Sequence, residues 1–417
     1  MRILFFTHYF PPEGNAPASR THENCKRWVR RGHKVTVITC APNVPDGVVY
    51  DGHKNKLYQS ENVDGIHVIR VWTYIAANKG TIRRIINYAS YMFSAVFFSL
   101  FLKKPNLIIA TSPQFFCGWA GVIVSRLRRV PFILEIRDIW PESIVAVGAL
   151  RNKRLLRILE WLEQKMYAAA QHIVTVGNGY KQELIKKGVP AQNISVIPNG
   201  FDHEIFYPRK SDDNIRQRYN LNHEFVCSYV GTIGMACGLE VVLRAAKLLK
   251  NRQRNDIRFL LVGSGATKNE LQKHALEENL NNITFVGRQD KHLIPGLLSI
   301  SDACLVHLKK TDIFKTVLPS KIFEAAAMAE PVILGVEGYA AEFLREANAG
   351  ICIEPENAEQ LTQAVEKLAD NPQLCRSLGQ SGREYVMEHH DRDSLANEYL
   401  DTIIRFSNST NRRGMTL

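Results

Sequence analysis

The sequence predicts an α/β protein with two doubly wound domains. Short apolar runs of strand length alternate with helical stretches almost from end to end, which is typical of parallel sheets covered by helices on both faces. The 417 residues are enough for two domains, each with its own hydrophobic core. A stretch that begins with Pro-Asn-Gly at 198–200 and stays polar to residue 222 separates the two halves, and its composition is that of a linker or hinge.

The apolar runs locate the strands. In the first half they predict strands at 3–7, 35–39, 68–72, 107–111, 132–136, 173–176 and 195–197, and in the second half at 225–230, 258–262, 284–286, 303–307, 332–334 and 350–353. We therefore expect an N-terminal domain over 1–200, a linker over 201–222 and a C-terminal domain over 223–390. The helix within 391–417 is expected to cross back to the N-terminal domain, and a ligand to lie at the carboxyl ends of the strands.

The composition is that of an ordinary globular protein, with 45% apolar and 23% charged residues. The net charge of +12 indicates a polyanionic neighbour. Because no nucleic-acid-binding motif is visible, we expect a phosphorylated substrate or an anionic membrane and no nucleic acid. The eight cysteines are scattered without a Cys-x-x-Cys pair, as expected of reduced, buried thiols in a cytoplasmic protein. Residues 1–7 are interpreted as a strand and not as a signal peptide.

The most apolar segment is 82–104. Its central part, 88–102, would span about 22 Å as a helix, less than the roughly 30 Å of a bilayer's hydrocarbon core. Four basic residues flank it, and no acidic residue interrupts it: Arg83, Arg84, Lys103 and Lys104. This pattern predicts a helix that lies on an anionic membrane surface without crossing it. A helix buried entirely against the first sheet is the alternative.

Residues 318–334 read as a helix followed by a short buried strand. Pro319 presets the backbone for a first turn, and Ser320 can cap the free N–H groups. Lys321 and Glu324 are three residues apart and so share one face of the helix. A helix N-terminus with a lysine attracts an anion, and a glutamate one turn in can accept from paired hydroxyls. The segment therefore predicts a site for a nucleoside diphosphate, although a capped amphipathic helix with a surface salt bridge would have the same residues.

The loop after the first strand of a doubly wound domain faces the ligand. Here that loop and the helix after it contain Gly14, Asn15 and Arg20. Gly14 lets the backbone approach a phosphate or sugar closely, and the helix presents its N-terminus there. We assign these three residues to an acceptor- or phosphate-binding loop, and an irregular proline-rich turn is the alternative.

Charged residues also follow the strand at 132–136. Arg137 and Asp138 stand at its carboxyl end, which is the functional edge of a parallel sheet, and are therefore candidate catalytic residues. An ion pair between these two neighbours is the structural alternative. In the second domain, Gly231, Thr232 and Gly234 form the equivalent loop, whose backbone N–H groups could make a nest for phosphate.

Two further patterns are discounted. Asp-Arg-Asp at 391–393 has the spacing of a metal–diphosphate motif, but it precedes a helix at 394–406 and is interpreted as a helix cap. His389 and His390 lack acidic or cysteine partners at ligand spacing, and both are expected at the surface. We therefore predict no metal site.

Several motifs resemble the family-four retaining glycosyltransferases of the GT-B fold. They are Tyr-Phe-Pro-Pro-Glu-Gly at 9–14, Arg-Arg-Gly-His-Lys-Val-Thr-Val at 30–37, and Ile-Pro-Asn-Gly-Phe-Asp at 197–202 with Phe206 and Pro208. A narrower branch, which contains N-acetyl-L-fucosaminyltransferases of capsule, O-antigen and exopolysaccharide assembly, is similar at 137–143, 231–234 and 319–324. The resemblance covers residues 1 to about 405. It implies two Rossmann-like domains that face a central cleft, the first for the acceptor and the second for the nucleotide sugar.

The sequence departs from the family's pattern in the donor site. The family carries two glutamates eight residues apart; Glu324 matches the second, whereas the first falls on Thr316. The family's arginine and lysine for the diphosphate fall near Thr232 and Cys237, and a common histidine is replaced by Arg137.

By resemblance, Glu324 is carried over as the ribose contact, with Ser320 and Thr316 in the same donor site. The diphosphate is reassigned to Lys321, the amides of 231–234 and Arg288. The resemblance implies no metal and no other cofactor, because positive side chains and amides stabilise the departing UDP. Front-face attack would retain the configuration of the sugar, so no enzymatic nucleophile is required.

The resulting expectation is the transfer of a sugar, such as N-acetyl-L-fucosamine, from a UDP-sugar to a polyprenyl-diphosphate-linked saccharide in surface polysaccharide assembly. The enzyme would be cytoplasmic and peripheral, held on the inner face of the cytoplasmic membrane through 82–104. One alternative is a nucleotide-sugar 2-epimerase of the same fold. Another is a catalytically silent binding homologue, which the missing first glutamate favours.

Overall fold

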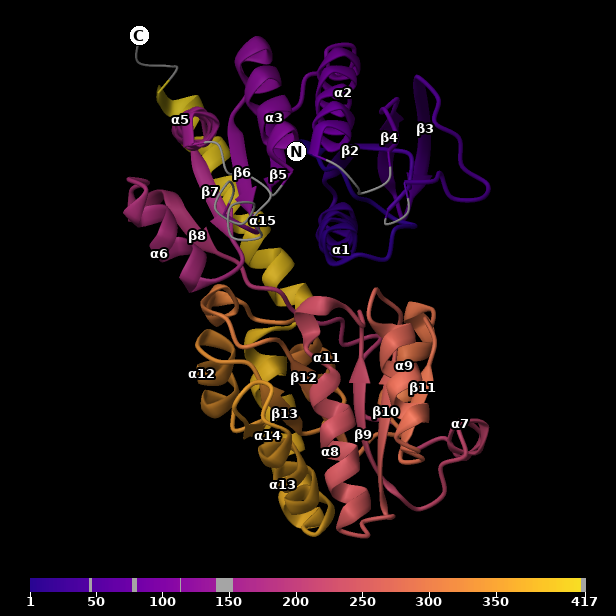
Figure 1. Cartoon of the computed structure of the whole chain (residues 1–417). Helices are drawn as coiled ribbons and strands as arrows, with labels where there is room; N and C mark the ends of the chain where they lie inside the picture. The colour runs from indigo at the N-terminus through magenta and orange to yellow at the C-terminus, as the bar shows by residue number, and fades with distance from the viewer. Residues whose placement is uncertain (45–46, 77–80, 113, 140–152, 414–417) are drawn as a thin grey trace. The chain divides into compact units, whose positions relative to one another are not determined.

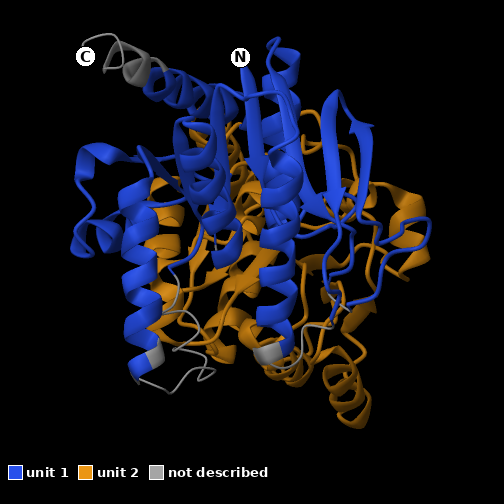
Figure 2. Ribbon diagram, turned by 90° about the horizontal axis from the view of Figure 1, so that it is seen from above, with its two compact units in different colours: residues 1–199, 392–417 blue, residues 200–391 orange. Residues whose placement is uncertain are grey.

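The computed structural model describes residues 1–44, 47–76, 81–112, 114–139 and 153–413, and Figure 1 labels most of its helices and strands. Residues 140–143 of the predicted motif at 137–143, and residues 414–417 of the predicted C-terminal segment, lie outside the described residues. The chain forms two compact units, coloured separately in Figure 2. Unit 1 comprises 1–199 and 392–417, and unit 2 comprises 200–391.

Unit 1 is built on one sheet with the strand order β3-β4-β2-β1-β5-β6-β7-β8. The strands are β1 (Arg2–Phe6), β2 (Lys34–Cys40), β3 (Tyr58–Val63), β4 (Ile66–Val71), β5 (Leu107–Ser112), β6 (Phe132–Ile136), β7 (His172–Thr175) and β8 (Ile194–Val196). Neighbouring strands are parallel, except that β3 pairs antiparallel with β4. The strand order reverses between β1 and β5, which makes the loop after β1 a switch-point loop of a doubly wound sheet.

Helices cover both faces of this sheet. They are α1 (Ala16–Arg30), α2 (Thr81–Ser99), α3 (Phe115–Arg128), α5 (Lys153–Ala169), α6 (Asn178–Lys186) and α15 (Arg392–Arg413), with a 3₁₀ turn, η1 (Ala191–Asn193). Because side chains alternate along a strand, Ile3 and Phe5 of β1 pack in one core with residues of α1 and α15, while Leu4 and Phe6 pack in another with residues of α2 and α3. α2 and α3 lie side by side on that second face (Figure 1). The Trp28 indole of α1 donates to the Ala396 carbonyl of α15 at 2.9 Å.

Unit 2 is a Rossmann-like sheet with the strand order β11-β10-β9-β12-β13-β14, and all neighbours are parallel. The strands are β9 (Phe225–Val230), β10 (Ile257–Val262), β11 (Ile283–Val286), β12 (Ala303–His307), β13 (Val332–Gly335) and β14 (Gly350–Cys352). The order reverses between β9 and β12, so the loops after these two strands meet at the switch point, where such sheets bind ligands.

The helices of unit 2 are α7 (Asp213–Arg218), α8 (Glu240–Asn251), α9 (Lys268–Glu277), α10 (Ile294–Leu298), α11 (Lys321–Ala327), α12 (Tyr339–Glu346), α13 (Ala358–Ala369) and α14 (Pro372–His389). Its 3₁₀ turns are η2 (Met235–Cys237), η3 (Lys291–Leu293) and η4 (Asp312–Thr316). One core joins β9 and β10 to α8 and α13, and another joins β12 and β13 to α11, α12 and α14. Each face of the sheet is therefore buried.

The observed strands agree with the predicted ones to within about two residues at each end, and the expected fold of two Rossmann-like α/β units is confirmed. Residues 201–222, interpreted from the sequence as a linker, lie within unit 2 and include α7. His390 is not at the surface as expected: it is buried in unit 2, with its ring 4.5 Å from the Phe323 ring. All eight cysteines are free, and six of them are buried.

Candidate functional site

The carboxyl edge of the unit 2 sheet brings together Lys321 and the loop after β9. The Lys321 ammonium lies 2.5 Å from the Tyr229 hydroxyl and 3.8 Å from the centre of the Tyr229 ring. Burial lowers the pKa of Lys321 from its usual value to about 8, and interactions with Cys237 and Glu324 oppose this shift in part. The side chain also crosses Gly231, where an added Cβ would lie 2.3 Å from Lys321 Cε. Lys321 therefore rests on the loop predicted to bind phosphate.

That loop is held by the end of β10 and the loop that follows it. Gly231 N donates to the Val262 carbonyl at 2.8 Å, and Ile233 N donates to the Ser264 carbonyl at 3.0 Å. The two chains pass so closely that a Cβ at Gly263, where φ is +143°, would lie 1.8 Å from the Gly231 oxygen. The predicted phosphate nest is therefore wrong for the amides of Gly231 and Ile233, because both already have acceptors. Among the described residues, no backbone carbonyl accepts from the amides of Thr232 and Gly234.

Helix α11 carries Glu324 beside Lys321, as the sequence predicts, but its entry differs. Ser320 is in helical conformation, and within the described structure its side chain makes no capping hydrogen bond. The capping role expected of Ser320 is therefore wrong. Glu324 is half-buried, whereas its neighbours Ile322 and Phe323 on α11 are fully buried. Ser320 and Glu324 remain candidate donor contacts.

Two predicted donor residues lie at the surface of unit 2. Thr316 ends η4 and is exposed, with its hydroxyl 3.4 Å from the Ile313 carbonyl. Arg288 is exposed after β11, a strand that β10 separates from β9 in the sheet. Thr316 therefore lies in the segment that leads to α11. Arg288 lies farther along the carboxyl edge of the sheet, after β11.

His307, which the sequence analysis did not single out, fixes the same edge. The Nε2 atom of His307 accepts from the Glu356 backbone N–H at 2.8 Å, so it carries no proton. The proton of the neutral ring is therefore on Nδ1, which donates to the Cys237 carbonyl at 2.7 Å. Burial lowers the pKa of His307, so the ring stays neutral. This histidine at the end of β12 joins two loops and has both ring nitrogens engaged.

In unit 1, Arg137 pairs with Glu135 at the end of β6. Arg137 Nε lies 3.8 Å from Glu135 Oε1, and Arg137 Nη2 donates to the Ala16 carbonyl at 3.5 Å. Burial lowers the pKa of Arg137 to about 10. The half-buried Asp138 follows directly, and burial together with its charge raises the pKa of Tyr180 to about 12. These two predicted catalytic residues thus stand at the carboxyl edge of the unit 1 sheet.

The loop after β1 is organised differently from the expectation. Asn15 caps α1, because its side chain accepts from Ala18 N at 2.9 Å. Gly14 is exposed. Arg20 is buried and donates to the carbonyl oxygens of Ile197 and Pro198 at 2.9 Å each. Arg20 thus holds the unit together, and its assignment as a phosphate ligand is corrected on this ground.

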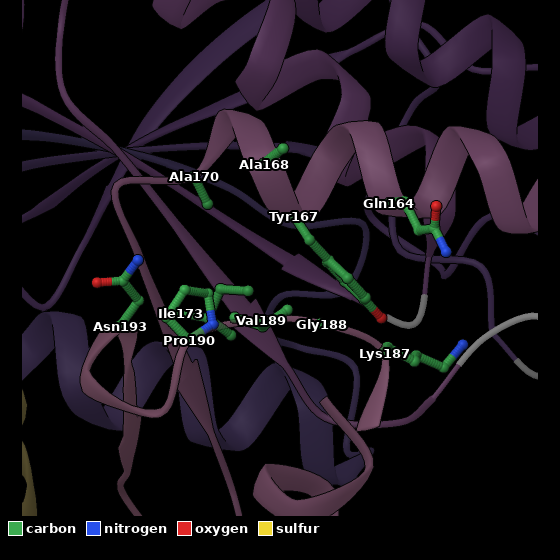
Figure 3. A pocket seen from close by; sticks show the side chains of 10 residues that line it. All are labelled: Gln164, Tyr167, Ala168, Ala170, Ile173, Lys187, Gly188, Val189, Pro190 and Asn193. Atoms are coloured by element: carbon green, nitrogen blue, oxygen red, sulfur yellow. The ribbon is translucent and has the colours of Figure 1, made fainter. Parts of the chain in front are cut away.

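A cavity of about 330 Å³ lies elsewhere in unit 1 (Figure 3). Its lining residues are Gln164, Tyr167, Ala168, Ala170, Ile173, Lys187, Gly188, Val189, Pro190 and Asn193. Most of them precede β7 and β8, so the cavity lies at the amino edge of the sheet, opposite to the edge that carries Arg137. It contains none of the predicted site residues. Within the described part of the chain, no group of three or more His, Cys, Asp or Glu side chains could hold a metal ion.

Known proteins match both units. A model of the glycosyl transferase 4-like domain matches residues 15–200, and a model of the glycosyl transferases group 1 matches residues 211–385. WcaI of Escherichia coli K12, which is named as a glycosyl transferase of colanic acid biosynthesis, is 26% identical over 97% of this chain and 100% of its own length.

Two solved structures show the same fold. Sucrose-phosphate synthase from Thermosynechococcus elongatus is similar with a TM-score of 0.73 and 18% identity, over 98% of this chain and 100% of its own. HepE of Anabaena, solved in complex with UDP-glucose, is similar with a TM-score of 0.72 and 18% identity, over 97% of this chain and 100% of its own.

Proposed function

The chain is a family-four glycosyltransferase of the GT-B fold, and from this premise we propose that it transfers a sugar from a UDP-sugar to a lipid-linked saccharide during surface polysaccharide assembly. The position of Lys321 and Glu324 carries the proposal: both stand on α11, with Lys321 against the switch-point loop after β9. This is the edge at which a Rossmann-like sheet receives a nucleotide. The UDP-glucose complex of HepE and the colanic acid assignment of WcaI support the same reading.

In the proposed mechanism, unit 2 binds the donor head. Glu324 accepts from the two ribose hydroxyls, and the Lys321 ammonium neutralises charge that develops on the departing diphosphate. The amides of Thr232 and Gly234 can donate to the same phosphates. This arrangement supplies positive charge from the protein, so the proposal requires no metal and no other cofactor.

Arg137 and Asp138 are the proposed catalytic residues of unit 1. Arg137 carries a guanidinium at the carboxyl edge of β6, and Asp138 beside it can orient an acceptor hydroxyl. With attack on the same face as the departing UDP, the configuration of the sugar is retained. From the motifs at 137–143 and 319–324 we propose an N-acetylated deoxyhexosamine, such as N-acetyl-L-fucosamine, as the transferred sugar.

The acceptor is proposed to be a polyprenyl-diphosphate-linked saccharide, and α2 supports this choice. The face of α2 that carries Tyr91 and Ala95 is buried against the sheet, and the single hydroxyl proton of Tyr91 is shared between the carbonyl oxygens of Thr7 at 3.0 Å and Ile38 at 2.8 Å. The helix is not buried all round, so the alternative of a segment packed entirely against the sheet is wrong. The exposed fraction of the side chain is 69% for Phe93, 55% for Phe97 and 74% for Phe101.

The apolar stripe stands beside positive charge. Phe93 and Phe97 are four residues apart and so share one face, on which Phe101 in the turn after α2 continues the stripe. Arg83 and Arg84 precede the stripe and Lys103 and Lys104 follow it, all four exposed. No helix of the described residues is long and apolar enough to cross a membrane. We therefore propose that unit 1 rests on the anionic inner face of the cytoplasmic membrane, with these aromatic rings at the headgroup level.

The test is a panel of UDP-, GDP- and ADP-sugars, each incubated with enzyme and a polyprenyl-diphosphate saccharide. We expect release of UDP only when both donor and acceptor are present, and a glycolipid that is one sugar longer. Conversion of the donor to its epimer without acceptor would instead identify a 2-epimerase. Binding of UDP without any turnover across the panel would identify a silent homologue.

A further inference from the structure

We infer that Tyr229 is a positioning residue, whose hydroxyl and ring together hold the Lys321 ammonium against the loop at 231–234. The inference rests on the proposed function in that it takes Lys321 as the group that meets the diphosphate. Lys321 comes from α11 and Tyr229 from β9, so one side chain joins the two segments that make the donor edge.

The hydroxyl of Tyr229 has its single proton committed elsewhere. It donates to the Thr232 carbonyl at 2.7 Å, so toward Lys321, 2.5 Å away, it can act only as an acceptor. An acceptor without a proton to offer selects the ammonium form of lysine over the neutral amine. In this chain of hydrogen bonds, the Lys321 ammonium therefore donates to the Tyr229 hydroxyl, which donates to the Thr232 carbonyl.

The ring of Tyr229 makes a second contact that also favours the ammonium form of Lys321. The Lys321 ammonium lies 3.8 Å from the ring centre, within the range in which the negative face of an aromatic ring attracts a cation. Tyr229 itself is fully buried, so its ring offers a fixed surface. On the other side, Gly231 leaves room that a Cβ would fill, since that atom would lie 2.3 Å from Lys321 Cε and 2.6 Å from Lys321 Nζ.

A lysine needs such support more than an arginine does. Its flexible four-carbon stem samples many rotamers, and a charge stabilises a transition state best when it is already in place. Because the ammonium is held by a ring, a hydroxyl and a bare glycine, ligand binding does not have to order it. The groups that titrate or carry charge around it are Tyr229, Cys237 and Glu324.

The experiment compares Tyr229→Phe with the matched control Tyr219→Phe in the full-length protein. The first keeps the ring and removes the hydroxyl next to Lys321; the second makes the same change at a half-buried tyrosine that follows α7 and packs against another core of unit 2. The rate at which an acylating reagent modifies Lys321 is followed against pH by mass spectrometry. Loss of one hydrogen bond to a charged group should lower the pKa of Lys321 by about one unit in Tyr229→Phe, and leave it unchanged in Tyr219→Phe.

Turnover gives a second readout. Tyr229→Phe should lower kcat about tenfold with a nearly unchanged KM for the donor, because a mispositioned charge affects the transition state more than the ground state. A labelling profile of Tyr229→Phe that coincides with that of the wild type overturns the inference. A shifted profile in a protein that neither binds nor releases UDP would uphold the positioning and reject the proposed function.

A measurement on the wild type guards against a variant that fails to fold. The Cε protons of Lys321, identified by their loss in Lys321→Arg, should resonate upfield of those of the other lysines, because the Nζ atom bonded to Cε lies over the Tyr229 ring, 3.8 Å from its centre. Resonances at the ordinary lysine position would show that the ammonium is not held there, and would overturn the inference without any change at Tyr229.

Discussion

The Arg20 guanidinium lies 3.4 Å from the Glu135 carboxylate, and both side chains are buried in unit 1. Arg20 stands on α1 and Glu135 on β6, so this pair joins a helix to the centre of the sheet. The remaining donors of Arg20 meet the Ile197 and Pro198 carbonyls and the Asn199 side chain. An arginine with this set of partners is a structural cross-link.

Arg20→Ala should therefore reduce stability and not substrate affinity. Breaking a buried charge pair costs about 3 kcal/mol or more, and the lower end applies here because Arg137 also lies near Glu135. Urea unfolding followed by circular dichroism measures the change. The control is Arg126→Ala, at an exposed position of α3, which should shift stability by less than about 0.5 kcal/mol. An Arg20→Ala protein of wild-type stability that binds its acceptor poorly would restore the assignment to a phosphate loop.

Glu324→Gln tests the donor head. The change keeps the shape of the side chain and removes the charge that strengthens hydrogen bonds from two ribose hydroxyls. Charge-assisted bonds contribute about 1.5–3 kcal/mol each, so the affinity for UDP should fall at least about tenfold. Titration calorimetry with UDP and with uridine measures it. Equal affinities of the variant and the wild type would remove the ribose assignment.

The fold could be predicted because each strand carries its signal in its own residues. The run at 107–111 is apolar at its first four positions because the strand is buried on both faces, and this run became β5. β3 was not predicted, since it is an exposed antiparallel edge strand of polar residues, Tyr-Gln-Ser-Glu-Asn-Val, which buries no side chain fully. Polar edge strands lack the apolar run on which the prediction depends.

The site could be predicted only in part. Lys321 and Glu324 were found because three-residue spacing on a helix has a geometric meaning in the sequence itself. The contact of Lys321 with Tyr229 joins residues 92 positions apart, and no local pattern encodes it. Arg20 was misassigned for the same reason. Its partners at 197–199 are 177 to 179 positions away, so the sequence showed a positive charge close to a ligand loop and not the groups that accept its hydrogen bonds.

Lys321→Ala should lower turnover by about a hundredfold or more, the loss usually seen when one charge-stabilising group is removed from an active site. If the lysine acts mainly on the departing diphosphate, kcat falls while the KM for the donor changes little. Steady-state kinetics with the donor found in the panel separates the two constants. A rise in KM alone would mean that Lys321 only holds the ground state.

The pH dependence of UDP binding follows from the same lysine. With a pKa of about 8 in the empty site, Lys321 is charged below this value and neutral above it. A diphosphate favours the charged form of Lys321 and raises its pKa in the complex, so the affinity for UDP should fall as the pH rises through 8, by about tenfold between pH 7 and pH 9. Calorimetry at several pH values measures this. Lys321→Arg should bind with little dependence on pH, and Cys237→Ala should keep the fall, which separates the lysine from the nearby thiol.

The exposed stripe on α2 yields the last prediction, tested by flotation with vesicles rich in phosphatidylglycerol. The wild type should float at low salt and detach at high salt, because each basic residue near an anionic surface contributes about 1 kcal/mol that ions screen. Replacing Arg83, Arg84, Lys103 and Lys104 by glutamine should reduce binding by about a thousandfold. A control with equal loss of charge replaces four exposed basic residues of unit 2, namely Lys210, Lys273, Lys367 and Arg376, and should float like the wild type.

Replacing Phe93, Phe97 and Phe101 by serine should weaken attachment at every salt concentration, since the apolar contribution is not screened. A wild type that never floats would reject the membrane surface and leave the transferase activity standing, whereas equal losses in both charge variants would mean that net charge, and not α2, carries the attachment.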